Sequence, residues 1–129
     1  MTASGPRTTV RAVLSRFSIS VSLLAVVAAL TFAGGASAAT TCKPPKYPGS
    51  GYFTSLSVTK TTCSVGGKVA NAYYKCRTAK SVKGRCSTKK KILGYSCRET
   101  RRSIATEIDG RVTCKRGSKR VVHSYQQDV

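Results

Sequence analysis

Six cysteines constrain the fold of this 129-residue chain more than any other feature of its sequence. They are Cys42, Cys63, Cys76, Cys86, Cys97 and Cys114. An even number of cysteines in so short a stretch predicts three disulfides, each contributing about 2–4 kcal/mol to stability. Zinc binding is the alternative, but the chain has no C-x-x-C pair, and its single histidine has no partner at the spacing of a zinc site. We therefore predict structural disulfides, no metal and no other cofactor.

The first 38 residues have the pattern of a secretory signal peptide. Three arginines and no acid precede an apolar run over residues 17–33, and the small-residue motif Ala36-Ser37-Ala38 follows it. An uncleaved membrane anchor is disfavoured because the run is short for a bilayer span and contains serines and a threonine. A lipid anchor on Cys42 is disfavoured because Thr41 is bulky and five cysteines would remain. We expect a secreted, extracellular protein that is cleaved near Ala38, keeps no transmembrane segment and is monomeric.

The charge of the chain is strongly positive and its expected mature length is small. It carries 23 Lys and Arg against four Asp and Glu, a net charge of +19. Removal of residues 1–38, which hold three of those cations and none of the acids, leaves +16 over 91 residues. A chain of that length forms one small domain with a modest core. We predict a signal peptide over 1–38, a proline-rich N-terminal arm over 39–51 and a disulfide-rich domain over 52–129.

Two segments, 51–59 and 91–98, alternate between apolar and polar residues. This period of two predicts half-buried strands. The side chains expected on the covered face are Tyr52, Leu56 and Val58 from the first segment and Leu93, Tyr95 and Cys97 from the second. Phe53 and Ile92 then point to the opposite face. Between the two strands, residues 78–91 form a basic loop that Cys86 fixes at its middle.

The apolar residues of 61–77 fall instead on one helical stripe. They are Val65, Val69, Ala72, Tyr73 and Cys76. Thr62 or Ser64 can cap the helix, and Cys76 is expected to point inward to a disulfide partner. Gly66 and Gly67 each weaken the first turn by about 1 kcal/mol relative to Ala. We therefore expect these glycines to allow a close approach of the backbone to a neighbour.

Two turn signals near the C-terminus predict β-hairpins. With Gly117-Ser118 as a two-residue turn, Cys114 faces Val121 and Val112 faces His123. These side chains, with Tyr125, would form the covered face, while Arg111, Thr113, Lys115 and Arg120 would point outward.

The other turn signal is Asp109-Gly110, which follows residues 103–108. A bulge with Gly110 left-handed would put Thr106 opposite Val112 and Ile104 opposite Cys114, which keeps Glu107 off the buried side. Burying a lone carboxylate is costly, so this register is preferred to a strict two-residue turn. The fold class that results is α+β: one helix packed on a small antiparallel sheet of three to five strands, stapled by three disulfides.

The order of Cys63, a helix ending in AYYKC, GYSC at 94–97 and VTCKRGSKRVV at 112–122 resembles small exported proteins of actinobacteria with a Cys–helix–GYxC–CxxG layout. The resemblance covers residues 52–125 and concerns the layout, not a site. It implies secretion and the fold, and it implies no activity. Cys42 and Cys86 are extra to that layout, which implies that they bond each other.

Hydrolysis needs a general base, and His123 is the one imidazole in the chain. A small secreted ribonuclease could combine it with Glu99 or Glu107 and with arginines that hold a phosphate. The expected register, however, puts His123 on the covered face and Glu107 at a turn. No phosphate-binding loop, nucleophile elbow or metal motif is present. We therefore expect no enzyme, and His123 is interpreted as a core residue.

A positive field over a small domain favours binding of polyanions. The candidate cations are Arg98, Arg111, Lys115, Arg116, Lys119, Arg120, Lys89, Lys90 and Lys91. Envelope phosphates, acidic polysaccharides and non-specific nucleic acid are the possible partners. Specific recognition of single strands also needs exposed aromatic rings, and only Phe53, Tyr74 and Tyr47 are expected to be exposed.

Two further alternatives stay open. A cationic antimicrobial or toxin-like protein would need an exposed apolar face beside the cations, whereas the apolar stripes lie where a core requires them. The basic surface could also serve only to keep a small domain soluble. The sequence thus predicts a secreted, non-enzymatic module, with polyanion binding as its candidate activity.

Overall fold

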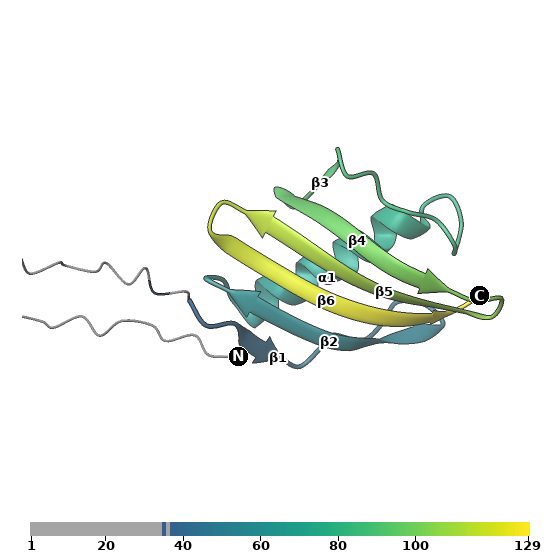
Figure 1. Ribbon diagram of the computed structural model, residues 1–129, viewed down its shortest axis with the longest axis horizontal. Coiled ribbons are helices and arrows are strands. Elements are labelled where there is room, and N and C mark those ends of the chain that lie inside the picture. The colour runs from purple at the N-terminus through teal and green to yellow at the C-terminus, as the bar shows by residue number, and fades with distance from the viewer. Residues whose placement is uncertain (1–34, 36) are drawn as a thin grey trace, which may run out of the picture. The chain divides into compact units, whose positions relative to one another are not determined.

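The computed structural model describes residues 35 and 37–129 (Figure 1). Its elements are β1 (Thr40–Cys42), β2 (Gly51–Thr59), α1 (Cys63–Thr78), β3 (Lys91–Ile92), β4 (Tyr95–Ser103), β5 (Glu107–Arg116) and β6 (Lys119–Asp128). The expected signal peptide, apart from Gly35, Ser37 and Ala38, lies outside the described residues. In the part of the chain that is described, no helix is both long and apolar enough to cross a bilayer.

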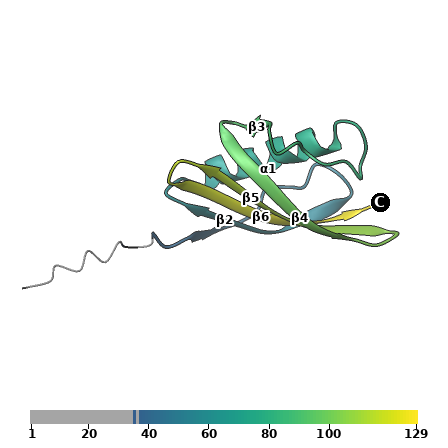
Figure 2. The same cartoon turned by 45° about the horizontal axis from the view of Figure 1, so that its top comes forward.

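The strands form one antiparallel sheet in the order β1-β2-β6-β5-β4-β3. β4, β5 and β6 make a meander, and β6 returns to pair with β2, while α1 connects β2 to β3 across one face (Figure 2). The α+β class is confirmed, but the sheet has six strands, not three to five. The extra strands are short edges. β1 comes from the proline-rich arm, and β3 is separated from β4 by a turn in which Leu93 and Gly94 have φ of 51° and 83°.

The helix begins where the sequence pattern predicts. The Thr62 hydroxyl accepts a hydrogen bond of 3.2 Å from the backbone N–H of Val65, which caps the first turn. Val69 and Tyr73 are buried against the sheet. A Cβ on Gly66 would be 2.6 Å from a methyl carbon of Val58, so the close approach expected at the glycine pair occurs at Gly66.

A β-bulge in β2 changes which side chains face the helix. The register against β6 shifts between Phe53 and Ser55, so one extra residue lies between them. Phe53 is therefore buried on the same face as Leu56 and Val58, and Tyr52 is 54% exposed. The expectation for Tyr52 and Phe53 was wrong, because strict alternation does not survive a bulge. Tyr47, expected to be exposed, is buried against the Phe53 ring.

The predicted alternation also fails at the β3–β4 turn. Leu93, expected on the covered face, is 56% exposed, and Ile92 is buried in its place. The left-handed backbone of Leu93 and Gly94 interrupts the alternation that the sequence suggests. Tyr95 and Cys97, which follow the turn, lie on the covered face as predicted.

The hairpin at Gly117-Ser118 is confirmed, with Cys114 opposite Val121 and Val112 opposite His123. The hairpin at Asp109-Gly110 is wrong. Gly110 lies inside β5, opposite Tyr125, and the chain turns instead between Ile104 and Glu107, whose backbone groups are joined by a hydrogen bond of 2.9 Å. A Cβ on Gly110 would be 2.3 Å from the Tyr125 ring, so this glycine serves ring packing and not a turn.

The three expected disulfides are present, and all six cysteines belong to them. The pairs are Cys42–Cys63, Cys76–Cys86 and Cys97–Cys114. The pairing of Cys42 with Cys86 was wrong. β1 pairs with the end of β2 that is nearest the start of α1, and this pairing puts Cys42 beside Cys63. Cys86, in the loop after α1, bonds to Cys76 in the last part of the helix.

Candidate polyanion-binding face

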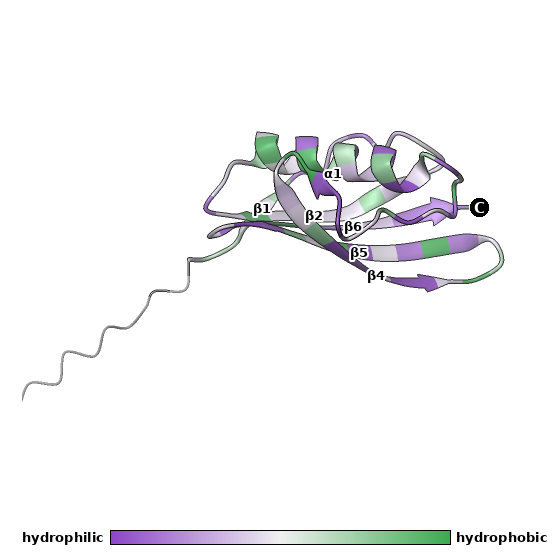
Figure 3. Ribbon diagram, turned by 90° about the horizontal axis from the view of Figure 1, so that it is seen from above, coloured by the Kyte–Doolittle hydropathy of each residue, from purple (hydrophilic) through white to green (hydrophobic). Residues whose placement is uncertain are grey.

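The sheet has one covered face and one open face (Figure 3). α1 lies along the covered face, where Val112, Cys114, Val121 and Tyr125 are buried. The alternate residues of the central strands point to the other side. We call this side the open face and define it by Ser96, Arg98, Thr100, Arg102, Asp109, Arg111, Thr113, Lys115, Arg120, Val122, Ser124 and Gln126.

The nine candidate cations are all exposed. Arg98, Arg111, Lys115 and Arg120 lie on the open face; Arg116 and Lys119 flank the β5–β6 turn; and Lys89, Lys90 and Lys91 lie just before and within β3. The fold therefore gathers most of them at the end of the sheet that holds the β5–β6 turn. Arg111 lies further along β5, toward the opposite end.

A row of four paired residues, three of them cations, crosses β3, β4, β5 and β6 near that turn. Lys115 of β5 lies directly opposite Arg120 of β6 and, on its other side, opposite Ser96 of β4. Ser96 in turn pairs with Lys91 of β3, whose ammonium group donates a hydrogen bond to the Ser96 hydroxyl. Like charges directly opposite each other destabilise a sheet. The row is therefore unfavourable for the isolated domain, and an anion bound beside it would relieve the repulsion.

The acids lie elsewhere. Glu107 and Asp109 lie at the start of β5, and Asp128 at the end of β6 pairs with Glu107, so three of the four acids are at this end of the sheet. Lys115 and Arg116 are at its other end, about 20–30 Å away at 3.3 Å per residue. The fourth acid, Glu99, has a nearly buried side chain under the helix. The end of the sheet at the β5–β6 turn is therefore basic, whereas the other end has charges of both signs, with Arg102 opposite Asp109; the candidate cations other than Arg111 lie at the basic end.

A hollow of about 420 Å³ opens on the basic half of the open face. It is lined by Thr88, Ser96, Cys97, Arg98, Thr113 and Lys115. Sequence reasoning identified its two cations but missed its three hydroxyl groups. Ser96 and Thr113 could have been found, because each lies two residues from a candidate cation on an alternating strand. Thr88 could not, because only the position of the loop before β3 brings it there.

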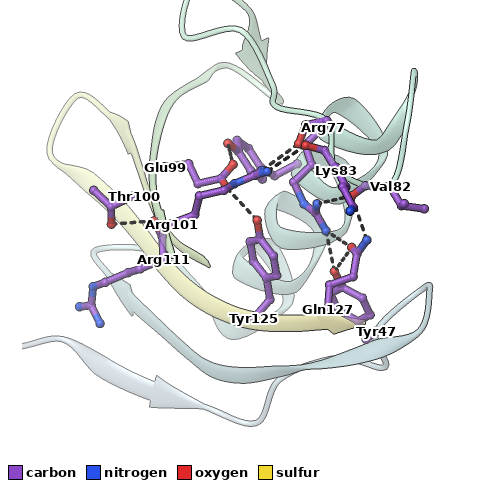
Figure 4. Close-up of polar contacts among 12 residues, drawn as sticks. Tyr47, Arg77, Val82, Lys83, Glu99, Thr100, Arg101, Arg111, Tyr125 and Gln127 are labelled. Carbon is purple, nitrogen blue, oxygen red and sulfur yellow. Dashed lines mark hydrogen bonds and ion pairs between the residues drawn. The ribbon is translucent and has the colours of Figure 1, made fainter. Parts of the chain in front are cut away.

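The covered face holds a buried polar cluster around Glu99 (Figure 4). Its carboxylate pairs with Arg101 and accepts hydrogen bonds of 2.6 Å from the Tyr73 hydroxyl and 2.7 Å from the Tyr125 hydroxyl. Burial raises the pKa of Glu99, but the three hydrogen bonds outweigh it and hold the pKa below its ordinary value. Burial, reinforced by Glu99, raises the pKa of both tyrosines.

A second buried cluster centres on Arg77, which is 1% exposed. Its guanidinium donates to the Tyr47 hydroxyl at 2.6 Å, to the side-chain oxygen of Gln127 and to the backbone carbonyl of Val82 at 3.1 Å. It also lies 4.3 Å from the centre of the Tyr125 ring, a cation–π contact (Figure 4). Three oxygen atoms and the face of the Tyr125 ring thus compensate the buried positive charge of Arg77. Both clusters join the helix, the sheet and the loop after α1, and neither was predicted.

His123 lies in the core, as the sequence predicted, and is 1% exposed. The ring edges of Phe53 and Tyr73 pack against it, and its Nδ1 has no hydrogen-bond partner. Burial lowers the pKa of His123 to about 4, so the imidazole is neutral at physiological pH. A substrate on the surface cannot reach this ring, which disfavours its use as a general base.

No group of three His, Cys, Asp or Glu side chains within residues 35 and 37–129 is placed to hold a metal ion. No family model, curated protein or solved structure matches this chain. The resemblance to actinobacterial exported proteins therefore stays an expectation.

Proposed function

We propose that this protein is a secreted, non-enzymatic module that binds anionic polymers of the extracellular space or cell envelope through the basic end of its open face. Three disulfides are consistent with an oxidising, extracellular location. Secretion itself is the prediction made from the sequence pattern of residues 1–38. The main support is that Lys115 of β5 stands directly opposite Arg120 of β6, with Lys91 two strands away on β3 and only Ser96 of β4 between Lys115 and Lys91.

Solubility alone does not require this arrangement. A solubilising surface works best when charges of both signs are interspersed and like charges are spread apart. Here the end of the sheet at the β5–β6 turn carries Lys115, Arg116, Lys119 and Arg120 without an acid, whereas at the other end Asp109 lies opposite Arg102. A polymer with regularly spaced phosphate or sulfate groups would contact several cations at once and release counterions on binding.

The test compares two variants that lose the same charge. The first replaces Lys115, Arg116, Lys119 and Arg120 with Ser; the second replaces Lys43, Lys46, Lys68 and Lys75, which are exposed on the arm and the helix. Both are loaded on immobilised heparin and on isolated cell wall and eluted with a salt gradient. The first variant should elute at clearly lower salt than the second. Equal elution would mean that net charge alone governs retention and would refute the surface.

The two alternatives have less support. A membrane-active protein needs a contiguous apolar face, but the exposed large apolar residues Tyr52, Val82, Leu93 and Ile104 are on separate elements. Dye release from anionic vesicles at physiological salt would favour that alternative. A ribonuclease would have to use His123, and cleavage of RNA that His123→Ala abolishes would favour it.

A further inference from the structure

The hollow on the open face has a regular arrangement of donors around it. Ser96 pairs directly with Lys115, and two residues further along both strands Arg98 pairs directly with Thr113. The four side chains therefore stand at the corners of a rectangle of about 5 Å across the strands and about 7 Å along them. The cations occupy one diagonal and the hydroxyls the other, and Thr88 approaches from the edge of the sheet.

We propose that this hollow is a specific site for one tetrahedral oxyanion group, a phosphate or sulfate ester carried by the anionic polymer. The inference rests on the proposed function and adds to it one defined site within the charged face. The centre of the rectangle is about 4 Å from each corner, so all four side chains are close enough to donate hydrogen bonds to an oxyanion seated above it. Arg98 can donate two parallel hydrogen bonds, and Lys115 supplies a point charge.

The hydroxyl groups distinguish this site from a merely basic surface. Ser96 and Thr113 each bring an O–H donor between the two cations, so a ligand would find donors in four directions. A tetrahedral anion can use all four directions, whereas a planar carboxylate is satisfied by the Arg98 fork alone. No acid lines the hollow, so every charged group there favours an anion.

Three interactions hold the loop that contains Thr88. The Cys76–Cys86 disulfide anchors the chain two residues before it. Within 83–90, the backbone N–H of Lys90 donates to the carbonyl of Ser87 at 3.0 Å. Arg101 of β4 donates to the carbonyl of Gly84 at 2.8 Å, which ties the loop to the sheet. The edge of the hollow is therefore preorganised, which lowers the entropic cost of binding.

The experiment titrates the oxidised, secreted protein with inorganic phosphate, sulfate and acetate at pH 7, with ionic strength held constant by NaCl. Amide resonances are followed by NMR. Phosphate or sulfate should perturb residues 96–98 and 113–115 at concentrations where acetate does not. A clear preference for phosphate identifies phosphate-bearing polymers as the source, and a preference for sulfate identifies sulfated polysaccharides. Equal response to acetate, or perturbation confined to the β5–β6 turn, would overturn the proposal.

Three substitutions complete the test. Arg98→Gln should raise the Kd for the preferred anion by about tenfold or more, and Thr113→Val, which keeps the shape of the side chain, by about threefold. Arg102→Gln is the matched control, because Arg102 is an exposed cation on the same strand and the same face, four residues away. It should change the Kd by less than about twofold. If Arg98→Gln did not fold, Thr113→Val against Arg102→Gln would decide.

The variants distinguish a failure of the oxyanion subsite from a failure of polymer binding by the face. If the Ser variant at Lys115, Arg116, Lys119 and Arg120 loses retention on cell wall while Arg98→Gln and Arg102→Gln have equal effects, the face binds polymer by diffuse charge. In that case the subsite is wrong and the proposed function stands. If neither set of variants alters retention, both are wrong.

Discussion

The Tyr73 hydroxyl on α1 and the Glu99 carboxylate on β4 are 2.6 Å apart, and their hydrogen bond joins the helix to the sheet. The same carboxylate accepts a hydrogen bond from Tyr125 of β6 and pairs with Arg101. Arg101 also donates to the carbonyls of Lys83 and Gly84 in the loop after the helix. One acidic side chain thus links three parts of a domain whose apolar core is small.

Replacement of Glu99 with Gln should therefore destabilise the domain strongly. The Arg101 side chain is 3% exposed, so loss of its partner leaves a buried charge uncompensated, at a cost of about 3–5 kcal/mol. Denaturant unfolding of the oxidised protein measures the loss. Asp109→Asn removes an acid from an exposed position of β5 and should change stability by less than about 0.5 kcal/mol. Similar losses for both variants would contradict the role assigned to Glu99.

Stability should also fall in mild acid, mainly because of His123. Its ordinary pKa is 6.5 and its pKa in the fold is about 4, so between these values the unfolded chain binds more protons than the folded chain. The free energy of unfolding should decrease by about 3 kcal/mol as the pH falls from 6.5 to 4. The Glu99 pKa is also lower in the fold, so its protonation on unfolding adds to the loss below the ordinary carboxyl range.

Two measurements check the contribution of His123. NMR of the single imidazole should show no titration between pH 7 and pH 5. His123→Leu removes the group, and although this variant starts from a different stability, its free energy of unfolding should vary less with pH between 6.5 and 4. A slope as steep as that of the unmodified protein would assign the acid sensitivity to other groups.

The adjacent glycines of α1 should respond in opposite directions to the same substitution. Alanine is favoured over glycine in a helix by about 1 kcal/mol. At Gly67 the nearest atom to a new Cβ is 3.6 Å away on Pro45, so Gly67→Ala should stabilise the domain by about that amount. At Gly66 the new Cβ would be 2.6 Å from Val58, and overpacking of this kind costs about 1–3 kcal/mol. Thermal unfolding should rank Gly67→Ala above Gly66→Ala, and the reverse order would refute the close packing of helix and strand.

The sequence predicted those parts of the fold that local pattern determines. The helix, its Thr62 cap and the Gly117-Ser118 turn all follow from residues within a few positions of each other. The errors concern residues whose role depends on a distant neighbour. Gly110 has the appearance of a turn residue, but it is small because the Tyr125 ring lies over it. Tyr52 and Phe53 exchange faces because of a bulge whose cause lies in the pairing of β2 with β6.

The candidate site also has a part that local sequence pattern predicts and a part that it does not. The cations could be selected from the sequence because charge is visible there, and alternation correctly placed Arg111, Lys115 and Arg120 on the open face. The hollow could not be predicted, since Arg98 and Thr113 meet only once β4 and β5 are in register. The error at Asp109-Gly110 shifted that register, which put Ile104 where Cys97 stands opposite Cys114.

Two disulfides provide a final test that separates stability from binding. Cys76–Cys86 closes a loop of 10 residues and Cys42–Cys63 a loop of 21. Loop-closure entropy depends only weakly on length, so removal of either pair by substitution with Ala should cost about 3 kcal/mol. Only Cys76–Cys86 anchors the segment that holds Thr88 at the hollow.

Loss of the Cys76–Cys86 pair should therefore weaken binding of the preferred oxyanion, with the largest changes at residues 96–98 and 113–115. Loss of the Cys42–Cys63 pair should leave the Kd unchanged despite a similar loss of stability, because that bond joins β1 to the start of α1. Denaturant unfolding and NMR titration of the two variants in parallel measure both quantities. Equal weakening of binding would show that the anion responds to global stability, and the anchored edge of the hollow would then have no special part in recognition.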